Sequence, residues 1–372
     1  MKLHQAPFLG IVVLVSILTT SSTICYGIQQ NNPIKVRRDT TMTEKLMVSQ
    51  ADRLSGGDGC ISIDMGNKES LFLWGDSFLG EVWQNTRKTN APLVFGNIFL
   101  KYKDGVSTTY HGGTAEHPAP LLSTDSIDGH KVVLWPQHGF VKNNILHLVL
   151  SDIVFTGTGT WDFYWHSASY CRLSLPDFKL IDKVTLSAKD LGDVHFGFGF
   201  LPVKNYRYFY GVKTDGAGQL SKLYVARAKV LNDKMANYEF YAAGKWLTDA
   251  SKAIALKGVD VGVSEQFSVF QHGKHYFLIT QEKGHGANDI YSFVADSPTG
   301  PWYNKKMIYS TPEPVKNPAV FSYNAMAHPQ FIKNGEVLIS YCVNAMNVPD
   351  LFTDVSIYRP RFFWVKLSDL LR

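Results

Sequence analysis

Short runs of apolar and aromatic residues recur along nearly the whole chain, and Gly, Asn, Asp and Pro separate them. Runs of four to eight residues rich in Val, Ile, Phe, Tyr and Trp are typical of β-strands. Stretches with helical periodicity are nearly absent. The chain has 372 residues, of which 45% are hydrophobic and 19% are charged, so it can bury a large core. We therefore expect an all-β protein.

The strands repeat as a unit: a polar residue opens a short apolar strand, and a turn leads to an aromatic-rich strand. This unit occurs five times, at intervals of roughly 60 to 80 residues, which suits four-stranded blades of a β-propeller. The sequence thus predicts a five-bladed β-propeller over residues 49–372. The run Arg361 to Leu367 has no blade of its own, so we expect this C-terminal strand to close the ring with the first blade. The five opening positions are Asp58, His138, His195, Glu265 and His328.

The N-terminal region has the features of an export signal. Lys2 precedes an apolar run from Phe8 to Leu18, which predicts a signal peptide over residues 1–27. Cys25 leaves a lipoprotein signal open as an alternative. Residues 28–48 are polar and rich in basic residues, and we expect a flexible leader there. The predicted mature protein is secreted or periplasmic, without a membrane anchor, and monomeric.

Charge and cysteine usage narrow the function classes. The formal net charge is +5, but the basic residues are spread along the chain, so we do not expect nucleic-acid binding. Cys60, Cys171 and Cys342 each lie in an apolar run and are expected to be buried thiols, with one disulfide left open. No short-range ligand spacing predicts a metal site or a cofactor, although three histidines on one axis leave an axial ion open.

The stretch from Gly56 to Gly80, GGDGCISIDMGNKESLFLWGDSFLG, predicts a β-hairpin with two carboxylates. Asp58 precedes its first strand and Asp76 follows its second. Because the strands are antiparallel, both residues are expected at the same edge of the sheet. Such a pair suits hydrolysis of a glycosidic bond. Asp-Gly and Gly-Asp are also ordinary turn dipeptides, so a purely structural role is the alternative.

Four sets of motifs stand out along the chain: GGDGCISI…LFLWGDSFLG, LYVARAKV…YEFYAAGKW, SPTGPW and AHPQF…LISYCVN…YRPRFFWVKL. They resemble secreted five-bladed propeller proteins that include endo-D-arabinanases. More distantly, the chain is similar to propeller glycosidases acting on arabinan and xylan. The resemblance implies that Asp58 and Asp76 are the catalytic aspartates, and it matches Glu265 to an acidic residue of a later blade. It implies a polysaccharide as the partner.

The residues themselves suggest roles in this site. Asp58 is expected to act as nucleophile or base, and Asp76, between Trp74 and Phe78, as the acid, although the two roles can be exchanged. The residues expected to bind substrate are His138, His195, His328, Trp165 and Arg359. Arg359 is alternatively expected to pair with an acid of the first blade. A non-catalytic carbohydrate-binding propeller and an interaction protein remain the rival hypotheses.

Overall fold

The computed structural model describes residues 34–159, 161–214, 216, 220–283 and 287–372. These residues belong to one compact unit, Ile34–Arg372. The predicted signal peptide, residues 1–27, lies outside them. Within the described residues, none of the helices combines the length and hydrophobicity needed to span a bilayer.

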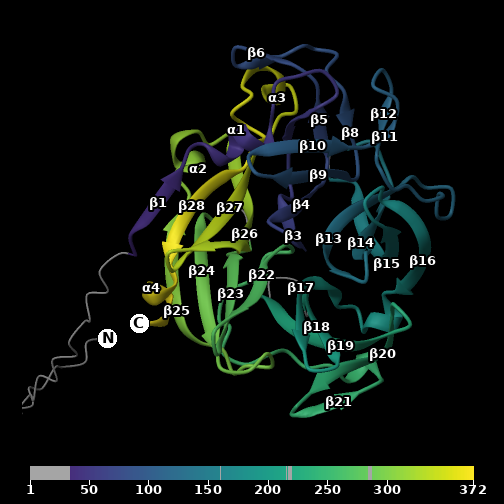
Figure 1. Ribbon diagram of the computed structural model, residues 1–372, viewed down its shortest axis with the longest axis vertical. Coiled ribbons are helices and arrows are strands. Elements are labelled where there is room, and N and C mark those ends of the chain that lie inside the picture. The colour runs from purple at the N-terminus through teal and green to yellow at the C-terminus, as the bar shows by residue number, and fades with distance from the viewer. Residues whose placement is uncertain (1–33, 160, 215, 217–219, 284–286) are drawn as a thin grey trace, which may run out of the picture. The chain divides into compact units, whose positions relative to one another are not determined.

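The described chain is all-β, and most of its strands belong to five larger sheets, which Figure 1 shows arranged around a common centre. The first sheet contains β3 (Ile61–Gly66), β4 (Glu69–Trp74), β9 (Ile98–Lys103) and β10 (Val106–Tyr110). The second contains β13 (Val132–Lys142), β14 (Ile145–Phe155), β15 (Phe163–Ser174) and β16 (Lys179–Ser187). The third contains β17 (His195–Val203), β18 (Tyr206–Thr214), β19 (Ser221–Leu231), β20 (Lys234–Ala242) and β21 (Lys245–Leu247).

The last two sheets complete this arrangement. The fourth contains β22 (Ser268–His272), β23 (His275–Gln281), β24 (Asp289–Ala295) and β25 (Tyr303–Ser310). The fifth contains β26 (Val320–Lys333), β27 (Glu336–Ala345), β28 (Arg361–Lys366) and β1 (Val36–Asp39). The first strands of the five sheets, β3, β13, β17, β22 and β26, contact one another in cyclic order. The ladders between the described strands of these sheets are antiparallel, as the repeated unit predicted.

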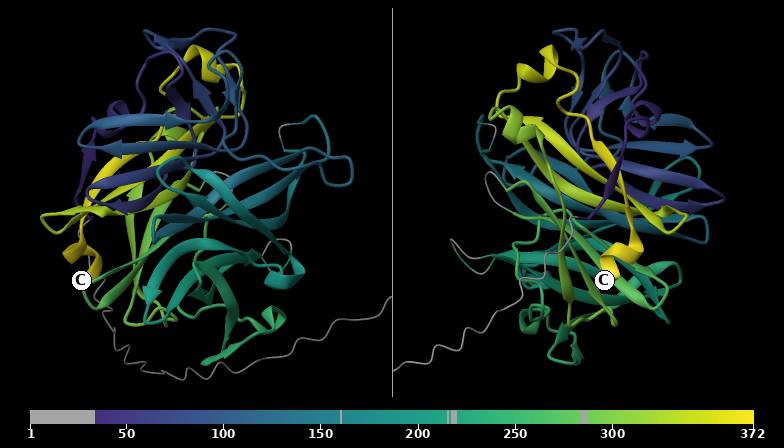
Figure 2. Two further views of the ribbon diagram at one scale, coloured as in Figure 1. Left: turned by 45° about the vertical axis from the view of Figure 1, so that its right-hand side comes forward. Right: turned by 90° about the vertical axis from the view of Figure 1, so that its left-hand side faces the viewer.

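Shorter elements occupy the connections. Three small sheets pair β2 (Leu54–Gly57) with β5 (Ser77–Leu79) and β8 (Leu93–Val94), β6 (Val82–Trp83) with β7 (Thr86–Arg87), and β11 (Gly112–Gly113) with β12 (Pro118–Ala119). The α-helices are α1 (Met42–Leu46), α2 (Glu313–Lys316), α3 (Asp350–Thr353) and α4 (Leu367–Leu371). The 3₁₀ turns are η1 (Lys189–Leu191) and η2 (Ala250–Lys252). Figure 2 shows the sheets from two further directions.

Two sequence predictions about the chain ends were wrong. The strand β28 does not join the first sheet; it pairs with β27 and with the N-terminal strand β1. Part of the predicted leader is ordered, because Val36–Asp39 forms β1 and Met42–Leu46 forms α1. Met42 and Leu46 are buried against apolar side chains of the first and last sheets, including Leu100 and Trp364. Burial of these side chains stabilises a segment whose composition suggested disorder.

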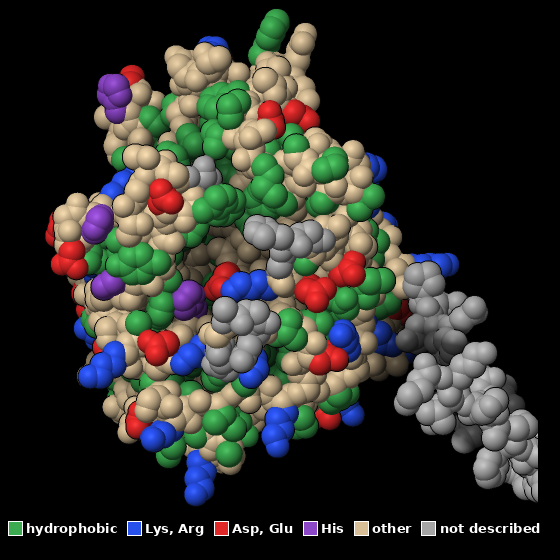
Figure 3. Space-filling view, turned by 180° about the vertical axis from the view of Figure 1, so that it is seen from behind, with side chains coloured by type: hydrophobic (Ala, Val, Ile, Leu, Met, Phe, Trp, Pro, Cys, Tyr) green, Lys and Arg blue, Asp and Glu red, His purple; other side chains and the backbone are tan. Residues whose placement is uncertain are grey.

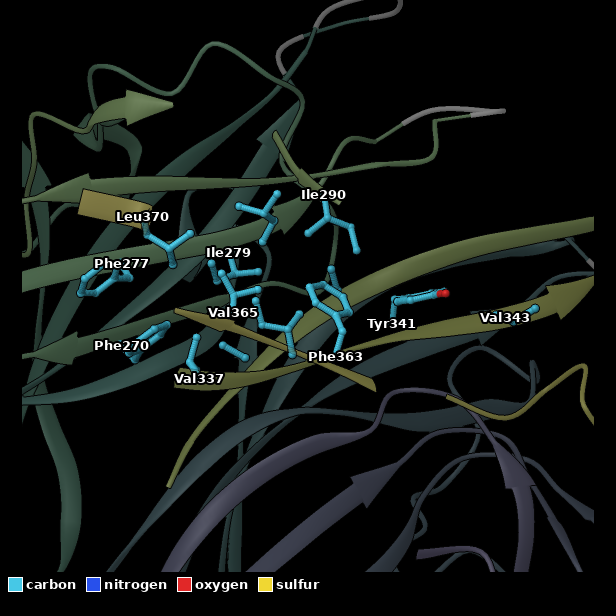
Figure 4. Packing of buried hydrophobic residues seen from close by; sticks show 14 of the residues in the cluster. Phe270, Phe277, Ile279, Ile290, Val337, Tyr341, Val343, Phe363, Val365 and Leu370 are labelled. Atoms are coloured by element: carbon cyan, nitrogen blue, oxygen red, sulfur yellow. The ribbon is translucent and has the colours of Figure 1, made fainter. Parts of the chain in front are cut away.

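The core lies between neighbouring sheets. Figure 4 shows one such layer, where Phe270, Phe277 and Ile279 of the fourth sheet face Val337, Phe363 and Val365 of the fifth. Because each sheet is covered on both faces, inner strands such as β4 are apolar at successive positions and lack a simple alternation. The three cysteines Cys60, Cys171 and Cys342 are buried free thiols, as expected.

Candidate active site

The hairpin β3–β4 places two carboxylates at one edge of the first sheet. Asp58 precedes β3 and Asp76 follows β4, and the amide of Gly75 donates a 2.9 Å hydrogen bond to the carbonyl of Asp58. Both side chains are partly exposed. Their proximity agrees with the sequence prediction, because antiparallel strands bring the start of one and the end of the other together.

Hydrogen bonds from the fifth sheet fix the Asp58 carboxylate. The Tyr323 hydroxyl donates to Asp58 Oδ2 at 2.8 Å, and Asn344 Nδ2 donates to the Tyr323 hydroxyl at 3.2 Å. Tyr358 is a second hydroxyl partner of Asp58. The carboxylate also needs the glycine at position 75, since a Cβ there would lie 2.4 Å from Asp58 Oδ1. The position of Asp58 is therefore defined on several sides.

Asp76 has a different set of partners. Its Oδ1 accepts hydrogen bonds from the Gly96 amide at 2.9 Å and from the Trp135 indole at 3.0 Å. Gly96 follows the short strand β8, and Trp135 belongs to β13 of the second sheet. The two carboxylates are thus held from opposite sides, Asp58 by the fifth sheet and Asp76 by the second.

The surroundings of the pair favour its protonated form. Desolvation raises the pKa of Asp58 to about 6, although hydrogen bonds from Tyr323 and Tyr358 oppose this rise. Desolvation, followed by the negative charge of Asp58, raises the pKa of Asp76 to about 7. Because the two groups repel each other when both are ionised, the pair tends to keep one proton near neutral pH. Asp76 has the higher pKa and is the better candidate for holding it.

Glu265 occupies a third position and differs electrostatically from this pair. Its carboxylate accepts from His195 Nδ1 at 3.1 Å and contacts Lys283 Nζ. Desolvation would raise its pKa, but the hydrogen bond and charge of His195, together with Lys283, lower it to about 2. Glu265 is therefore ionised over the working pH range. This state suits contact with substrate hydroxyls better than proton donation, and the predicted catalytic role of Glu265 stays a prediction.

His195 and Trp165 form one unit beside Glu265. The two ring centroids lie 3.9 Å apart at an interplanar angle of 43°. Trp165 also packs against the apolar cluster between the second and third sheets, and its buried indole nitrogen has no hydrogen-bond partner among the described residues. Trp165 thus packs against the ring of His195, and His195 itself is partly exposed.

A groove of about 490 Å³ opens beside these residues. Its lining includes Glu265, which precedes β22, and Lys283, which follows β23. Phe321 and Tyr323 of the fifth sheet and Trp161 from the connection between β14 and β15 also line it. Figure 3 shows a hollow near the middle of one face of the molecule, with acidic, basic, histidine and hydrophobic side chains around it. The described lining includes neither Asp58 nor Asp76, and Tyr323 links the two features because it lines the groove and contacts Asp58.

Two predicted substrate-binding histidines lie inside strands, and only one of them is fully buried. His328 is fully buried, and its ring nitrogens contact Ser62 Oγ at 2.7 Å and Ser340 Oγ at 2.8 Å. Without an exposed atom it cannot contact substrate, so this prediction was wrong. His138 lies well inside β13 beside Phe200, and burial lowers its pKa to about 4. The strands that contain these histidines, β13 and β26, begin at Val132 and Val320, further upstream than the repeated unit indicated.

Arg359 also has a role different from the predicted one. Its Nε donates to the carbonyl of Ser55 at 2.9 Å, and its guanidinium lies 3.5 Å from Glu44. It lines a separate cavity together with Glu44, Arg38 and Glu313. Arg359 therefore links the segment after β27 to β2 and α1, and its contacts include neither Asp58 nor the groove.

The residues that sequence reasoning missed are the partners of the carboxylates: Tyr323, Tyr358 and Trp135. The sequence carried a usable signal for two of them, because Trp135 and Tyr323 lie near the true starts of β13 and β26. Tyr358 comes from the segment before β28, where its φ is +69°. Among the described residues, no group of three or more His, Cys, Asp and Glu side chains is arranged to hold a metal ion.

Comparison with known families and structures supports the fold. A family model described as "Domain of unknown function (DUF5005)" matches residues 44–367. The sequence search found no match among curated proteins. A Bacteroides ovatus structure described as a presumed hydrolase is 18% identical, with a TM-score of 0.71, and the match covers 90% of this chain and 91% of that one.

A second Bacteroides ovatus structure, GH43B of a xyloglucan utilisation locus, is 11% identical with a TM-score of 0.50. That match covers 88% of this chain and 54% of the other. At these identities the likeness shows the fold alone, and it supports a β-propeller.

Proposed function

Because the chain belongs to the family described as a domain of unknown function (DUF5005), its activity has to be argued from its own site, and we propose that it is a glycoside hydrolase. One observation carries this proposal: Asp58 and Asp76 are held together with raised pKa values, and Tyr323, which contacts Asp58, also lines an open groove. A carboxylic acid next to a carboxylate is the pair that glycosidic hydrolysis requires.

The two carboxylates are assigned different roles. Asp76, with the higher pKa, donates its proton to the leaving oxygen of the glycosidic bond. Asp58 is the more readily ionised group, because Tyr323 and Tyr358 donate hydrogen bonds to it, and it attacks the sugar or activates water. After the bond breaks, Asp76 carries the negative charge and Asp58 is no longer a free carboxylate. If Asp58 has attacked the sugar, water then breaks the glycosyl–Asp58 ester and gives its proton to Asp76. If Asp58 has instead activated water, it holds the proton taken from that water and returns it to Asp76. Either route consumes one water molecule and restores the starting state of the pair.

The finer parts of the proposal concern substrate, location and architecture. We propose an arabinose-containing or related polysaccharide as substrate, on the resemblance to endo-D-arabinanases and to arabinan- and xylan-active enzymes. The N-terminal sequence supports secretion, and we propose that the enzyme acts as a monomer. The five sheets are proposed to be five blades, with the ring held by pairing of the chain ends through β1 and β28.

A substrate screen tests this function. The purified protein is incubated with arabinans, arabinogalactans, galactofuranans and xylans, and released sugars are measured by chromatography. The proposal predicts release from at least one of these polymers. Binding to a polymer without release, under conditions where the protein is folded, would favour the carbohydrate-binding alternative. If the protein neither binds nor cleaves any polymer of the panel, both the hydrolase proposal and the carbohydrate-binding alternative are contradicted.

A further inference from the structure

An exposed tryptophan lines the groove. Trp161 is 65% exposed, and its ring centroid is 6.4 Å from that of Phe321, which lies 5.2 Å from Tyr323. Trp161 follows β14 of the second sheet, whereas Phe321 and Tyr323 belong to β26 of the fifth. The inner strands of these two sheets are not neighbours, since β13 contacts β3 and β17 while β26 contacts β3 and β22. The aromatic contact therefore bridges two non-adjacent sheets.

These three aromatic residues connect the groove to Asp58 through successive contacts. Trp161, Phe321 and Tyr323 all line the groove, and the Tyr323 hydroxyl contacts Asp58. A sugar chain cleaved at Asp58 and Asp76 would thus meet Tyr323 next to the cleaved bond and could place its next units against the groove that Tyr323 lines. Large aromatic side chains are normally buried, so an exposed indole in a groove is a candidate contact for a ligand.

The chemistry of the groove matches a sugar. The flat aromatic surface of Trp161 can cover the apolar C–H face of a sugar ring, and the ionised Glu265 can accept hydrogen bonds from hydroxyl groups. Asn324 adds an amide to the lining, next to Ser264 at 3.4 Å. An apolar surface with a few polar groups is typical of small-ligand sites.

The charge of the groove restricts the class of sugar. Its described lining carries the acidic residues Glu265 and Glu282 and a single basic residue, Lys283, which already contacts Glu265. A uronic acid placed here would meet an excess of negative charge, with Asp58 nearby, and like charges disfavour binding. A neutral sugar meets no such repulsion.

We propose that this groove is a binding subsite for the neutral sugar units that flank the cleaved bond, with Trp161 as its stacking surface. The inference rests on the proposed function for the position of the cleaved bond. Beyond that function, it specifies that the bound sugar chain is neutral and that Trp161 makes binding depend on the length of that sugar chain. The substrate is then a neutral oligosaccharide or polysaccharide, and it binds more tightly when it is long enough to reach Trp161.

Binding measurements on a protein that cannot cleave its ligand test the subsite. The full-length Asp58→Asn variant is titrated calorimetrically with neutral arabino-, xylo- and galacto-oligosaccharides of two to six units, and with oligogalacturonides of the same lengths. We expect a neutral series to bind with affinity that rises with length, and the oligogalacturonides to bind at least about 10-fold more weakly. Adding Trp161→Ala is expected to lower the affinity for the longer oligosaccharides about 3- to 10-fold while leaving the disaccharide unchanged.

A matched control separates this effect from a general loss of surface tryptophan. Trp83, in β6, is 75% exposed and is not part of the groove lining, so Trp83→Ala should leave every affinity unchanged. The inference is overturned if Trp161→Ala binds all lengths as the parent does, if oligogalacturonides bind best, or if no neutral series binds.

Sugar release by the wild-type protein is measured in parallel, because it tests the hydrolase proposal separately. Length-dependent binding that needs Trp161, without any release, would retain the subsite and reject hydrolysis. Sugar release by the wild type, with no effect of Trp161→Ala on binding, would retain hydrolysis and reject the subsite.

Discussion

The hydroxyl of Tyr323 donates a 2.8 Å hydrogen bond to the carboxylate of Asp58, and so joins the last sheet of the molecule to the first. The two residues are separated by 265 positions in the sequence. A hydrogen bond from a donor favours the ionised form of a carboxylate, and here it opposes the desolvation that raises the pKa of Asp58. The contact therefore contributes to the difference in protonation between Asp58 and Asp76.

Removing this hydroxyl should change the pH dependence of sugar release. In Tyr323→Phe the pKa of Asp58 rises, so the ionised form needed for attack appears at higher pH. We expect the acidic limb of the activity profile to move upward by about half to one pH unit and the maximal rate to fall about 10-fold. Tyr303→Phe is the matched control, because the exposed Tyr303 donates to Asp296 at 3.0 Å. Identical profiles for Tyr323→Phe and the wild type would contradict this role.

The wild-type profile itself should be a narrow bell. Activity requires Asp58 ionised and Asp76 protonated, so it rises with pH as Asp58 loses its proton and falls as Asp76 loses its own. With pKa values of about 6 and about 7, the maximum lies between them. Measurement of release from pH 4 to pH 9 checks this prediction. A rate that keeps rising to pH 9 would exclude Asp76 as the acid.

Glycine at position 75 is expected to be required for activity. The Cβ of an alanine there would lie 2.4 Å from Asp58 Oδ1, so Gly75→Ala must displace the carboxylate. We expect at least about a 30-fold loss of activity while the circular dichroism spectrum is retained. In Gly262→Ala the new Cβ has its nearest atoms at 3.5 Å, an ordinary contact, and activity should stay near that of the wild type.

His328 has a structural role instead of the substrate-binding role that the sequence predicted. It was expected to bind substrate, but it links Ser62 of the first sheet to Ser340 of the fifth. His328→Ala should lower the free energy of unfolding by about 2–4 kcal/mol, because it leaves a cavity and two unpaired hydroxyls. The exposed His272→Ala should change it by less than about 0.5 kcal/mol. Chemical denaturation measures both, and an unchanged stability in His328→Ala would contradict this account.

Site features that depend on neighbours in the sequence could be predicted, whereas contacts between distant segments could not. Asp58 and Asp76 lie in one local hairpin, whose turn and strand pattern predicted their proximity. The partners Trp135 and Tyr323 come from other sheets, and locating them required the true starts of β13 and β26. An inner strand covered on both faces has no alternating pattern to mark where it begins, so His138 and His328 were assigned to the edge although they lie further along. Arg359 was misassigned because nothing local predicts its contact with Glu44.

The raised pKa of Asp76 also predicts a cost in stability. Its folded-state pKa lies above the ordinary value of 3.8, so the folded protein holds this proton more tightly than the unfolded chain. The associated stability is present at low pH and is lost as the pH rises from about 4 through about 7. Asp76→Asn should therefore be more stable than the wild type at pH 8, by about 1–3 kcal/mol, and nearly equal to it at pH 4. Equal stabilities at pH 8 would argue against an unfavourable, partly desolvated charge on Asp76.

The most direct test is sugar release by the wild type, Asp58→Asn and Asp76→Asn, measured on the polymer that the screen identifies. Asp104→Asn is the control, because Asp104 is exposed in a turn at φ +50°, a conformation that Asn also adopts readily. The account predicts that either active-site change lowers the rate by at least about 100-fold while folding is kept, and that Asp104→Asn matches the wild type. Equal release from the wild type and both active-site variants would contradict the assignment of Asp58 and Asp76 as the catalytic pair.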